Sequence, residues 1–192
     1  TGKILSMVSK PDFDPNTIGK NWESITTGEE SVLLNRVTQG AYAPGSVFKL
    51  VTTLAYMREN NAYANYSYTC ESEIEHEGTT IHCAKNRKHG EEDLMTSLAN
   101  SCNTSFCNIG LTLNITKFQN TAKELLFNSK LPSVLPYSQS KFQLETNASL
   151  AEVMMTSIGQ GKTQMSPYHM ALITSAIANG GILMEPYLVD HI

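Results

Sequence analysis

The apolar residues of the chain follow two kinds of pattern. Short apolar runs at 4–8, 182–184 and 187–192 predict buried strands. Between them, apolar positions recur at helical spacing and predict helices over 46–60, 92–100, 106–113, 116–127, 148–158 and 166–180. Strands at both ends with helices between them predict an α/β domain whose sheet uses both ends of the chain.

The clearest predicted helix is 46–60. Its apolar residues cover most of the helix circumference, which is typical of a buried central helix. The segments 11–45, 61–90 and 128–146 are rich in polar and turn-forming residues, and we expect loops there. Gly159-Gln160-Gly161 ends a helical pattern. We interpret it as a structural turn rather than a phosphate loop, because it lacks the strand–glycine–helix context of a dinucleotide site.

Composition excludes several classes of protein. The chain has 192 residues, of which 41% are hydrophobic and 17% charged, and this is the composition of a folded domain. Its formal net charge is -4, whereas a dedicated nucleic-acid binder usually carries a basic stripe. No apolar stretch approaches the roughly 18 residues that a membrane-spanning helix needs.

A serine and a lysine lie one turn apart at the start of the central helix. At positions i and i+3, the Ser46 hydroxyl and the Lys49 ammonium share one face. Unpaired backbone N–H groups and the helix dipole favour a developing negative charge there. A lysine on an apolar helix is desolvated, which lowers its pKa and lets it act as a base. The pair is therefore a candidate activated nucleophile, and the alternative is a capped helix with a solvent-reaching lysine.

The same spacing recurs at Ser138 and Lys141. That second pair lies in a polar loop without apolar neighbours, so we interpret it as a chance match. A different candidate is the turn Ser101-Cys102-Asn103, where a hydroxyl and a carboxamide two residues apart can point into one cleft. The alternative is that Ser101 or Asn103 only caps the following helix.

The four cysteines allow three interpretations: a disulfide, a zinc site or free thiols. Cys70 and Cys83 bracket a polar segment and are spaced for a disulfide that closes a loop. The histidines His76, His82 and His89 lie in or beside the same stretch, so a zinc site is an alternative, although no C-x2-C or H-x3-H pair supports it. Free thiols are the third reading.

Taken together, the two serine motifs, in this order and on these elements, resemble the S-x-x-K and S-x-N signatures of penicillin-binding proteins and serine β-lactamases. The flanking sequence is similar to class B penicillin-binding proteins over essentially all 192 residues. The similar segments are 2–9 followed by 13–16, 34–49, His89-Gly90 before the S-x-N turn, 157–161, 165–171 and 178–181.

The resemblance implies a fold and a reaction. The fold is the α/β penicillin-binding transpeptidase or serine β-lactamase-like fold, here one partial domain over 1–192 with a helical lobe and an incomplete antiparallel sheet. The reaction is D,D-transpeptidation of peptidoglycan stem peptides. Ser46 would attack the D-Ala-D-Ala carbonyl, and Lys49 would accept its proton. Ser101 would relay protons to and from the amine, and Asn103 would hold the substrate or β-lactam amide.

The resemblance also implies where the protein works and with what. β-Lactam antibiotics would acylate Ser46, and neither a cofactor nor a metal is expected. The parent protein would be anchored in the bacterial membrane with this domain on the extracytoplasmic face. No nucleic-acid partner is expected. Self-association through unpaired sheet edges is a further expectation.

One family motif is absent from the sequence. The third signature, K-[ST]-G, does not occur in the 192 residues, and Lys162-Thr163-Gln164 has Gln where the motif needs Gly. We therefore expect the chain to be a piece of a longer protein that ends before this motif, with little or no transpeptidase activity of its own.

Two rivals share the fold. A serine β-lactamase is one, because Glu124-Leu125-Leu126-Phe127-Asn128 superficially resembles the class A deacylating loop, although it has Phe at the fourth position. A non-catalytic β-lactam sensor or scaffold is the other. A metal-binding module built on Cys70, Cys83 and the nearby histidines is the most distant alternative.

Overall fold

The computed structural model describes residues 1–189, which fall into two units. The first unit comprises residues 1–42, 130–140 and 165 onward, and the second comprises 43–129 and 141–164. Both motif serines belong to the second unit.

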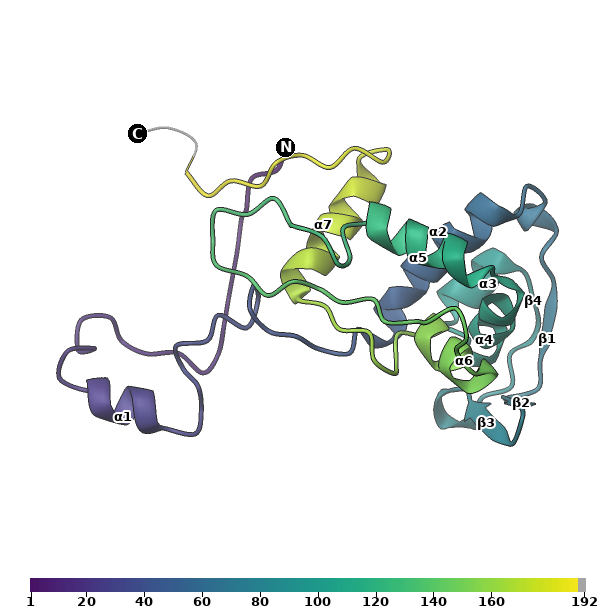
Figure 1. Ribbon diagram of the computed structural model, residues 1–192, viewed down its shortest axis with the longest axis horizontal. Helices are drawn as coiled ribbons and strands as arrows, with labels where there is room; N and C mark the ends of the chain where they lie inside the picture. Colours follow the sequence, from purple (N-terminus) through teal and green to yellow (C-terminus); the bar gives the residue numbers. More distant parts are fainter. Residues whose placement is uncertain (190–192) are drawn as a thin grey trace. The chain divides into compact units, whose positions relative to one another are not determined.

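The second unit is mainly helical. It contains a 3-10 turn (Gly45–Phe48) that continues into α2 (Lys49–Glu59), followed by α3 (Leu94–Ala99), α4 (Asn103–Thr112), α5 (Ile115–Glu124) and α6 (Leu150–Ser157). Helix α4 packs against α6, and α2 packs against α5 (Figure 1). Four buried phenylalanines, whose contacting ring centroids lie 5.0–6.3 Å apart, form an aromatic core: Phe48, Phe118, Phe127 and Phe142. The predicted helices of this unit are therefore confirmed, with ends shifted by a few residues.

Side-chain caps explain where several of these helices begin. Asp93 forms a capping box with Thr96 at the start of α3, and Ser149 forms one with Glu152 at the start of α6. Asn114 accepts a hydrogen bond from the Lys117 N–H at the start of α5. These short polar residues satisfy backbone donors that have no partner inside the helix.

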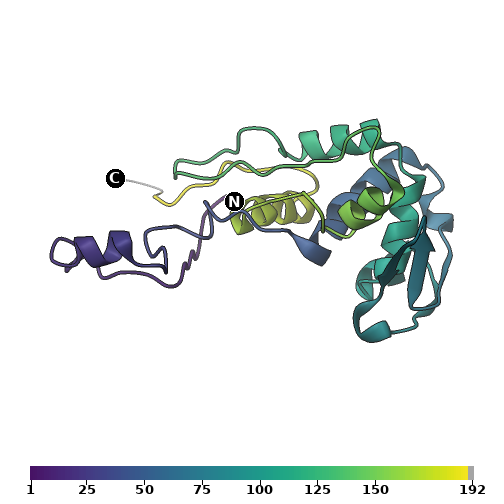
Figure 2. The same ribbon diagram turned by 60° about the horizontal axis from the view of Figure 1, so that its bottom comes forward.

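Two antiparallel ribbons replace the loop that we predicted over 61–90. Strand β1 (Tyr68–Cys70) pairs with β4 (Gly90–Glu92), and β2 (Glu73–His76) pairs with β3 (Thr79–His82). Figure 2 shows these ribbons beside the helices of the same unit, and α4 contacts β1, β2 and β3.

The loop prediction was wrong because the ribbons carry few apolar residues. In the β2–β3 pair, Ile74 and Ile81 form the one apolar cross-strand pair, and the flanking pairs are polar. The sequence therefore shows no run of alternating apolar and polar residues there. The turn that joins the two strands has positive φ at both Glu77 and Gly78, as two-residue hairpin turns prefer. This turn lacks the Asn-Gly or Asp-Gly sequence that signals such a hairpin most strongly.

The first unit contains α1 (Trp22–Thr27) and α7 (Pro167–Ala178). Ser166 caps α7 by accepting from the His169 N–H, with Pro167 in the first turn, so the helix begins where the range 166–180 was predicted to begin. Helix α1 was not predicted, and none of its residues is buried. Its sequence therefore lacks the apolar stripe by which a helix is recognised.

The predicted terminal strands do not form as regular strands. The segment 4–8 forms no regular strand. An isolated parallel bridge joins Lys3 to Tyr187, where the Ile4 N–H donates to the Tyr187 carbonyl oxygen, and Leu5 is 88% exposed. The segment 182–184 is likewise irregular. A strand requires a ladder of hydrogen bonds to a neighbour, and one bridge does not supply it. The two ends of the chain do pair at this bridge, as predicted, but residues 190–192 of the last predicted strand lie outside the described residues.

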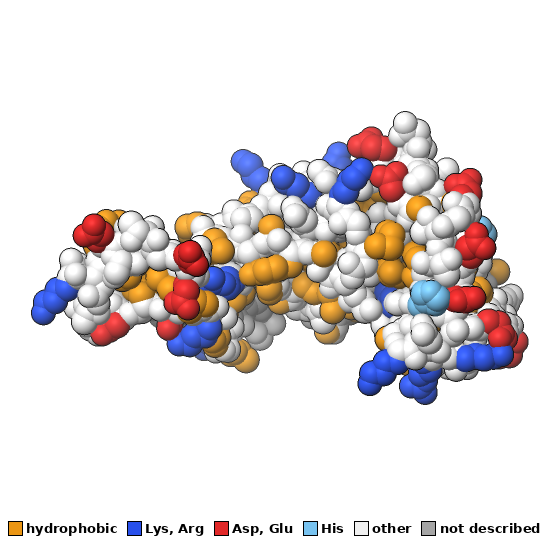
Figure 3. All heavy atoms as spheres, turned by 90° about the horizontal axis from the view of Figure 1, so that it is seen from below, with side chains coloured by type: hydrophobic (Ala, Val, Ile, Leu, Met, Phe, Trp, Pro, Cys, Tyr) orange, Lys and Arg blue, Asp and Glu red, His pale blue; other side chains and the backbone are white. Residues whose placement is uncertain are grey.

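Helices with small antiparallel ribbons give the predicted α/β class. Among residues 1–189, none of the helices combines the length and the hydropathy that a bilayer crossing would need. On the face drawn in Figure 3, basic side chains occur in separate groups with acidic ones between them, rather than as a continuous stripe.

Candidate active site

Ser46 lies on a turn that is braced by a glycine from elsewhere in the second unit. The side chain of Ser46 is exposed, within the 3-10 turn that leads into α2. The N–H of Gly45 donates to the carbonyl oxygen of Gly159 over 2.8 Å. Gly159 has φ +73°, and a Cβ there would lie 2.1 Å from the Gly45 oxygen. The predicted structural turn at 159–161 therefore holds the serine turn in place, and only glycine fits at this close approach.

The Lys49 side chain is fully buried and joins the two serine motifs. Its Nζ lies 3.3 Å from the Ser46 Oγ and 3.1 Å from the Ser101 Oγ. Nζ also donates to the Ser101 carbonyl oxygen and to the Asn103 Oδ1, each over 2.7 Å. The four predicted site residues thus meet at one ammonium group, although Ser101 and Asn103 are more than fifty residues further along the chain.

Burial changes the acidity of this lysine. Desolvation lowers the pKa of Lys49 from 10.5 to about 8, against smaller opposing effects from neighbouring cysteines and Glu92. The ring of Phe106 lies beneath Nζ, with its centroid 5.5 Å away. A lysine with a pKa near 8 is neutral in part of the population at physiological pH, and this is the form that can accept a proton.

The S-x-N turn has an unusual backbone. Ser101 has φ +51°, in the left-handed region, and it sits between the end of α3 and the start of α4. The N–H of Cys102 donates to the Ser97 carbonyl oxygen over 2.9 Å. The Asn103 amide donates to the His82 carbonyl oxygen over 2.9 Å, which fixes the direction of its Oδ1 toward Lys49.

The residue that caps α4 is Cys102, whereas we predicted Ser101 or Asn103 for that role. The Cys102 Sγ accepts from the Ser105 N–H at 3.4 Å. The Ser101 and Asn103 side chains are therefore free of capping and contact Lys49 instead. Phe106 and His82 were not predicted to belong to the site. They contribute a ring face and a backbone oxygen, and neither contribution leaves a signal in the sequence.

The second S-x-x-K match has other partners. The Ser138 hydroxyl donates to the Gln39 carbonyl oxygen over 2.7 Å, and Lys141 pairs through its backbone with Gln164. Ser138 and Lys141 belong to different units. This arrangement agrees with its interpretation as a chance match.

Comparisons with known proteins identify the class. The family model described as the penicillin binding protein transpeptidase domain matches residues 1–192. The chain is 30% identical to peptidoglycan D,D-transpeptidase PbpA of Mycolicibacterium smegmatis and 32% identical to PbpA of Mycobacterium tuberculosis, with all of the chain aligned in both cases. Each alignment covers 41% of the relative, so the chain spans less than half the length of these curated relatives.

A solved structure agrees with the sequence relatives. The ceftriaxone acyl-enzyme complex of penicillin-binding protein A from M. tuberculosis superposes with a TM-score of 0.88 at 30% identity. That superposition covers 98% of this chain and 45% of the crystallised one. The predicted fold is therefore confirmed.

Proposed function

The chain belongs to the penicillin-binding protein transpeptidase family, and from this premise we propose that it carries the nucleophile and the proton-transfer groups of a serine D,D-transpeptidase. One observation carries the proposal: the buried Nζ of Lys49 lies within hydrogen-bond reach of the hydroxyls of both Ser46 and Ser101. A nucleophile in contact with a base of lowered pKa, and the base in contact with a second proton carrier, is the arrangement that acyl transfer requires.

In the first half of the reaction, neutral Lys49 accepts the proton of Ser46 while the Ser46 oxygen attacks the carbonyl carbon of D-Ala-D-Ala. The backbone N–H of Ser46 lies in the first helical turn, where N–H groups have no intrahelical partner, and it is placed to stabilise the oxyanion. Ser101 then passes a proton from Lys49 to the departing amine. The product is an acyl-enzyme on Ser46.

In the second half, the amine of another stem peptide attacks the acyl-enzyme, and the proton returns along the same groups. Asn103 binds the amide of the acyl donor while it keeps Lys49 oriented through Oδ1. A β-lactam follows the first half only, because its opened ring stays attached and blocks the acceptor. We propose that this chemistry serves peptidoglycan cross-linking on the extracytoplasmic face of the membrane, with peptidoglycan stem peptides and β-lactams as partners. The relatives named peptidoglycan D,D-transpeptidases support the proposed reaction.

The absence of the third family motif from the 192 residues affects the expected rate of acylation. The 192 residues contain no K-[ST]-G sequence, and in the chance match at 162–164 the Lys162 Nζ is paired with Glu152 at 2.9 Å. In the 192-residue polypeptide taken by itself, a substrate carboxylate would not meet a cation and a second oxyanion donor from such a motif. We expect acylation of this chain to be slow and incomplete rather than absent.

A serine β-lactamase is the second candidate, and one observation disfavours it. Glu124, the residue that would have to activate a deacylating water, pairs with Arg58 at 2.5 Å on the exposed surface of α5. An acyl-enzyme on Ser46 should therefore persist. A non-catalytic β-lactam sensor would also acylate, so turnover of a stem-peptide donor with an amine acceptor distinguishes it from a transpeptidase.

The test is intact-mass spectrometry of the purified protein after prolonged incubation with benzylpenicillin. We expect a partial population with one added penicillin mass, and peptide mapping should place the adduct on Ser46. Ser46→Ala should abolish the adduct, while Ser138→Ala, at the other S-x-x-K serine, should leave it unchanged. An adduct that survives Ser46→Ala, or no adduct on protein shown to be folded, would refute the proposal.

A further inference from the structure

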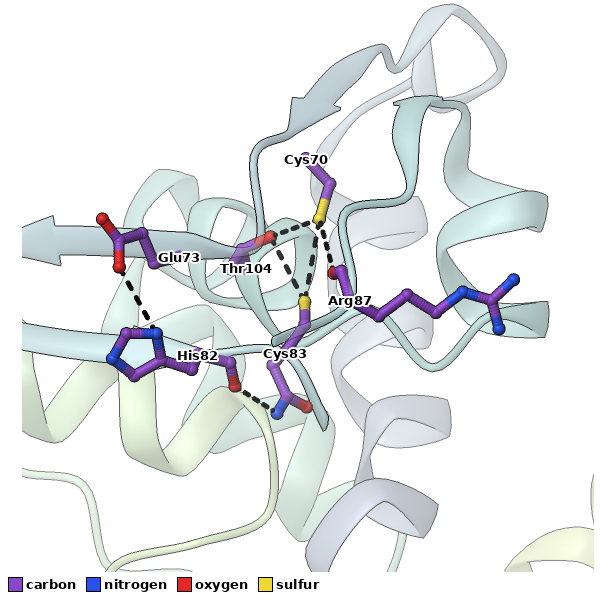
Figure 4. Close-up of polar contacts among 7 residues, drawn as sticks. Cys70, Glu73, His82, Cys83, Arg87 and Thr104 are labelled. Atoms are coloured by element: carbon purple, nitrogen blue, oxygen red, sulfur yellow. Dashed lines mark hydrogen bonds and ion pairs between the residues drawn. The ribbon is translucent and has the colours of Figure 1, made fainter. Parts of the chain in front are cut away.

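Three cysteines and one histidine meet beside the S-x-N turn. Cys70 ends β1, Cys83 follows β3, His89 precedes β4, and Cys102 caps α4. The three cysteines are at least 98% buried and the histidine is half-buried. One ligand atom from each residue lies within 4.8 Å of the other three. Figure 4 shows the Cys70 and Cys83 sulfurs turned toward each other.

The spacing of these atoms is that of a tetrahedral zinc site. With Zn–S near 2.3 Å, tetrahedral geometry puts two sulfurs about 3.8 Å apart, and with Zn–N near 2.1 Å it puts a sulfur and a nitrogen about 3.6 Å apart. The Cys83 Sγ lies 3.7 Å from the Sγ of Cys70 and 3.7 Å from the Sγ of Cys102. The Cys70 Sγ lies 3.3 Å from the His89 Nδ1.

We propose that Cys70, Cys83, His89 and Cys102 bind one Zn²⁺ ion in a closed Cys3His site. Thiolate and imidazole ligands in a closed tetrahedral set select zinc over the hard cations Mg²⁺ and Ca²⁺, which prefer oxygen ligands. Binding converts three thiols to thiolates, so three protons leave to solvent and the site carries a net charge of -1. No electron transfer is involved.

Polar groups around the cluster are placed to support thiolates. The Thr104 hydroxyl donates to the Cys70 Sγ over 3.2 Å, and the Ser105 N–H donates to the Cys102 Sγ over 3.4 Å. Such outer contacts orient metal ligands and stabilise their charge. The other two histidines of this region lie elsewhere. His82 pairs with Glu73 at 3.4 Å (Figure 4), and His76 lies on β2.

One residue, Cys102, links the proposed zinc site to the active site. Cys102 lies between Ser101 and Asn103, the two residues that hold Lys49 Nζ through three oxygen atoms. A metal bound to Cys102 would tie this turn, including the left-handed Ser101, to both ribbons at once. We therefore infer that the ion positions the S-x-N turn rather than touching substrate.

From the sequence a metal site is the most distant alternative and no metal is expected, because the ligands follow no short spacing rule.

The alternative interpretations of the cysteines, a disulfide or free thiols, require different arrangements of the sulfur atoms. All four cysteines are free thiols in the structure, and a disulfide needs the sulfurs at about 2.05 Å rather than 3.7 Å. A disulfide would also consume two of the three sulfur ligands.

The first experiment measures metal in the full chain. The protein is purified under reducing conditions, equilibrated with Zn²⁺, dialysed, and assayed by elemental mass spectrometry. We expect one zinc per chain, and with Co²⁺ the intense visible bands of tetrahedral thiolate coordination. Less than a tenth of an equivalent, an octahedral cobalt spectrum, or an intact mass two hydrogens short with no zinc would overturn the proposal.

Variants then assign the ligands. Cys70→Ser, Cys83→Ser and His89→Ala should each weaken zinc affinity by at least tenfold. Cys107→Ala is the matched control, because Cys107 is a buried thiol on α4 whose pKa burial raises to about 12, and its sulfur contacts the Met154 carbonyl oxygen instead of the cluster. Equal zinc loss in Cys107→Ala would refute the assignment.

Ser46→Ala separates this inference from the proposed function. It should keep a full equivalent of zinc while losing any penicillin adduct, so each proposal can fail without the other. If the ligand variants do not fold, the cobalt spectrum of the unaltered chain still decides whether the site is tetrahedral and thiolate-rich.

Discussion

The Nζ of Lys49 lies 3.3 Å from the Oγ of Ser46, at the junction where a 3-10 turn becomes helix α2. The hydroxyl is exposed and the ammonium is buried, so substrate can reach the nucleophile while water is kept from the base.

The first prediction concerns pH. Because Lys49 must be neutral to accept a proton, the acylation rate should rise tenfold per pH unit below its pKa of about 8 and level off above it. Lys49→Ala should slow acylation by about 10²-fold or more and remove the inflection. Mass spectrometry of samples quenched at set times, between pH 6 and about 9.5, measures the pH dependence of the acylation rate and the effect of the variant. A flat profile in the unaltered protein would contradict the role of Lys49 as base.

The second prediction uses the contact between Asn103 and Lys49. Asn103→Asp places a carboxylate where Oδ1 now accepts from Nζ, and a negative neighbour stabilises the ammonium. The inflection of the pH profile should therefore move upward by about 1 unit or more.

Asn108→Asp is the matched control for this charge. Asn108 lies on the same helix α4, half-buried, and its amide donates to the Tyr66 hydroxyl instead of contacting Lys49. The Asn108→Asp variant should leave the inflection of the pH profile of acylation at its original pH. Identical shifts in both variants would indicate a general effect of charge on α4 rather than the specific contact.

The third prediction concerns the brace behind the serine. A methyl group in Gly159→Ala would lie 2.1 Å from the Gly45 oxygen and 2.6 Å from the Phe48 Cβ, so the turn must move. We expect a lower melting temperature and at least about tenfold slower acylation, since small misplacements of a nucleophile are costly.

Gly161→Ala controls for backbone strain alone. Gly161 also has positive φ, +79°, but a Cβ there meets its nearest atoms at 3.8 Å. It should lower stability without a matching loss of acylation rate. If the two alanine variants acylate equally, the close approach of Gly159 to Gly45 has no part in positioning Ser46.

The fourth prediction concerns stoichiometry. Without a K-[ST]-G sequence, the 192-residue chain should be labelled by a fluorescent penicillin well below one equivalent. Gel fluorescence against a standard of known occupancy measures this. Rapid labelling of nearly every molecule would show that the groups present suffice, and that the third motif is dispensable for acylation.

Local sequence predicted the features whose causes are local. The spacing of Ser46 and Lys49 and the presence of helices α2, α6 and α7 depend on residues within a few positions of one another, so the periodicity of the sequence predicted them. The polar ribbons over 68–92 were missed, because so few apolar residues mark their alternation.

The tertiary structure decided which groups meet. The sequence showed the S-x-x-K and S-x-N motifs on two separate elements, and the resemblance to a known family predicted that they form one site. Only packing of α2 against α4 brings Ser101 and Asn103 to the Lys49 ammonium, across more than fifty residues. In the same way, Cys70, Cys83, His89 and Cys102 come from four separate elements and converge only where the ribbons meet α4. Long-range contacts of this kind depend on how faces pack in three dimensions, and no short stretch of sequence encodes that geometry.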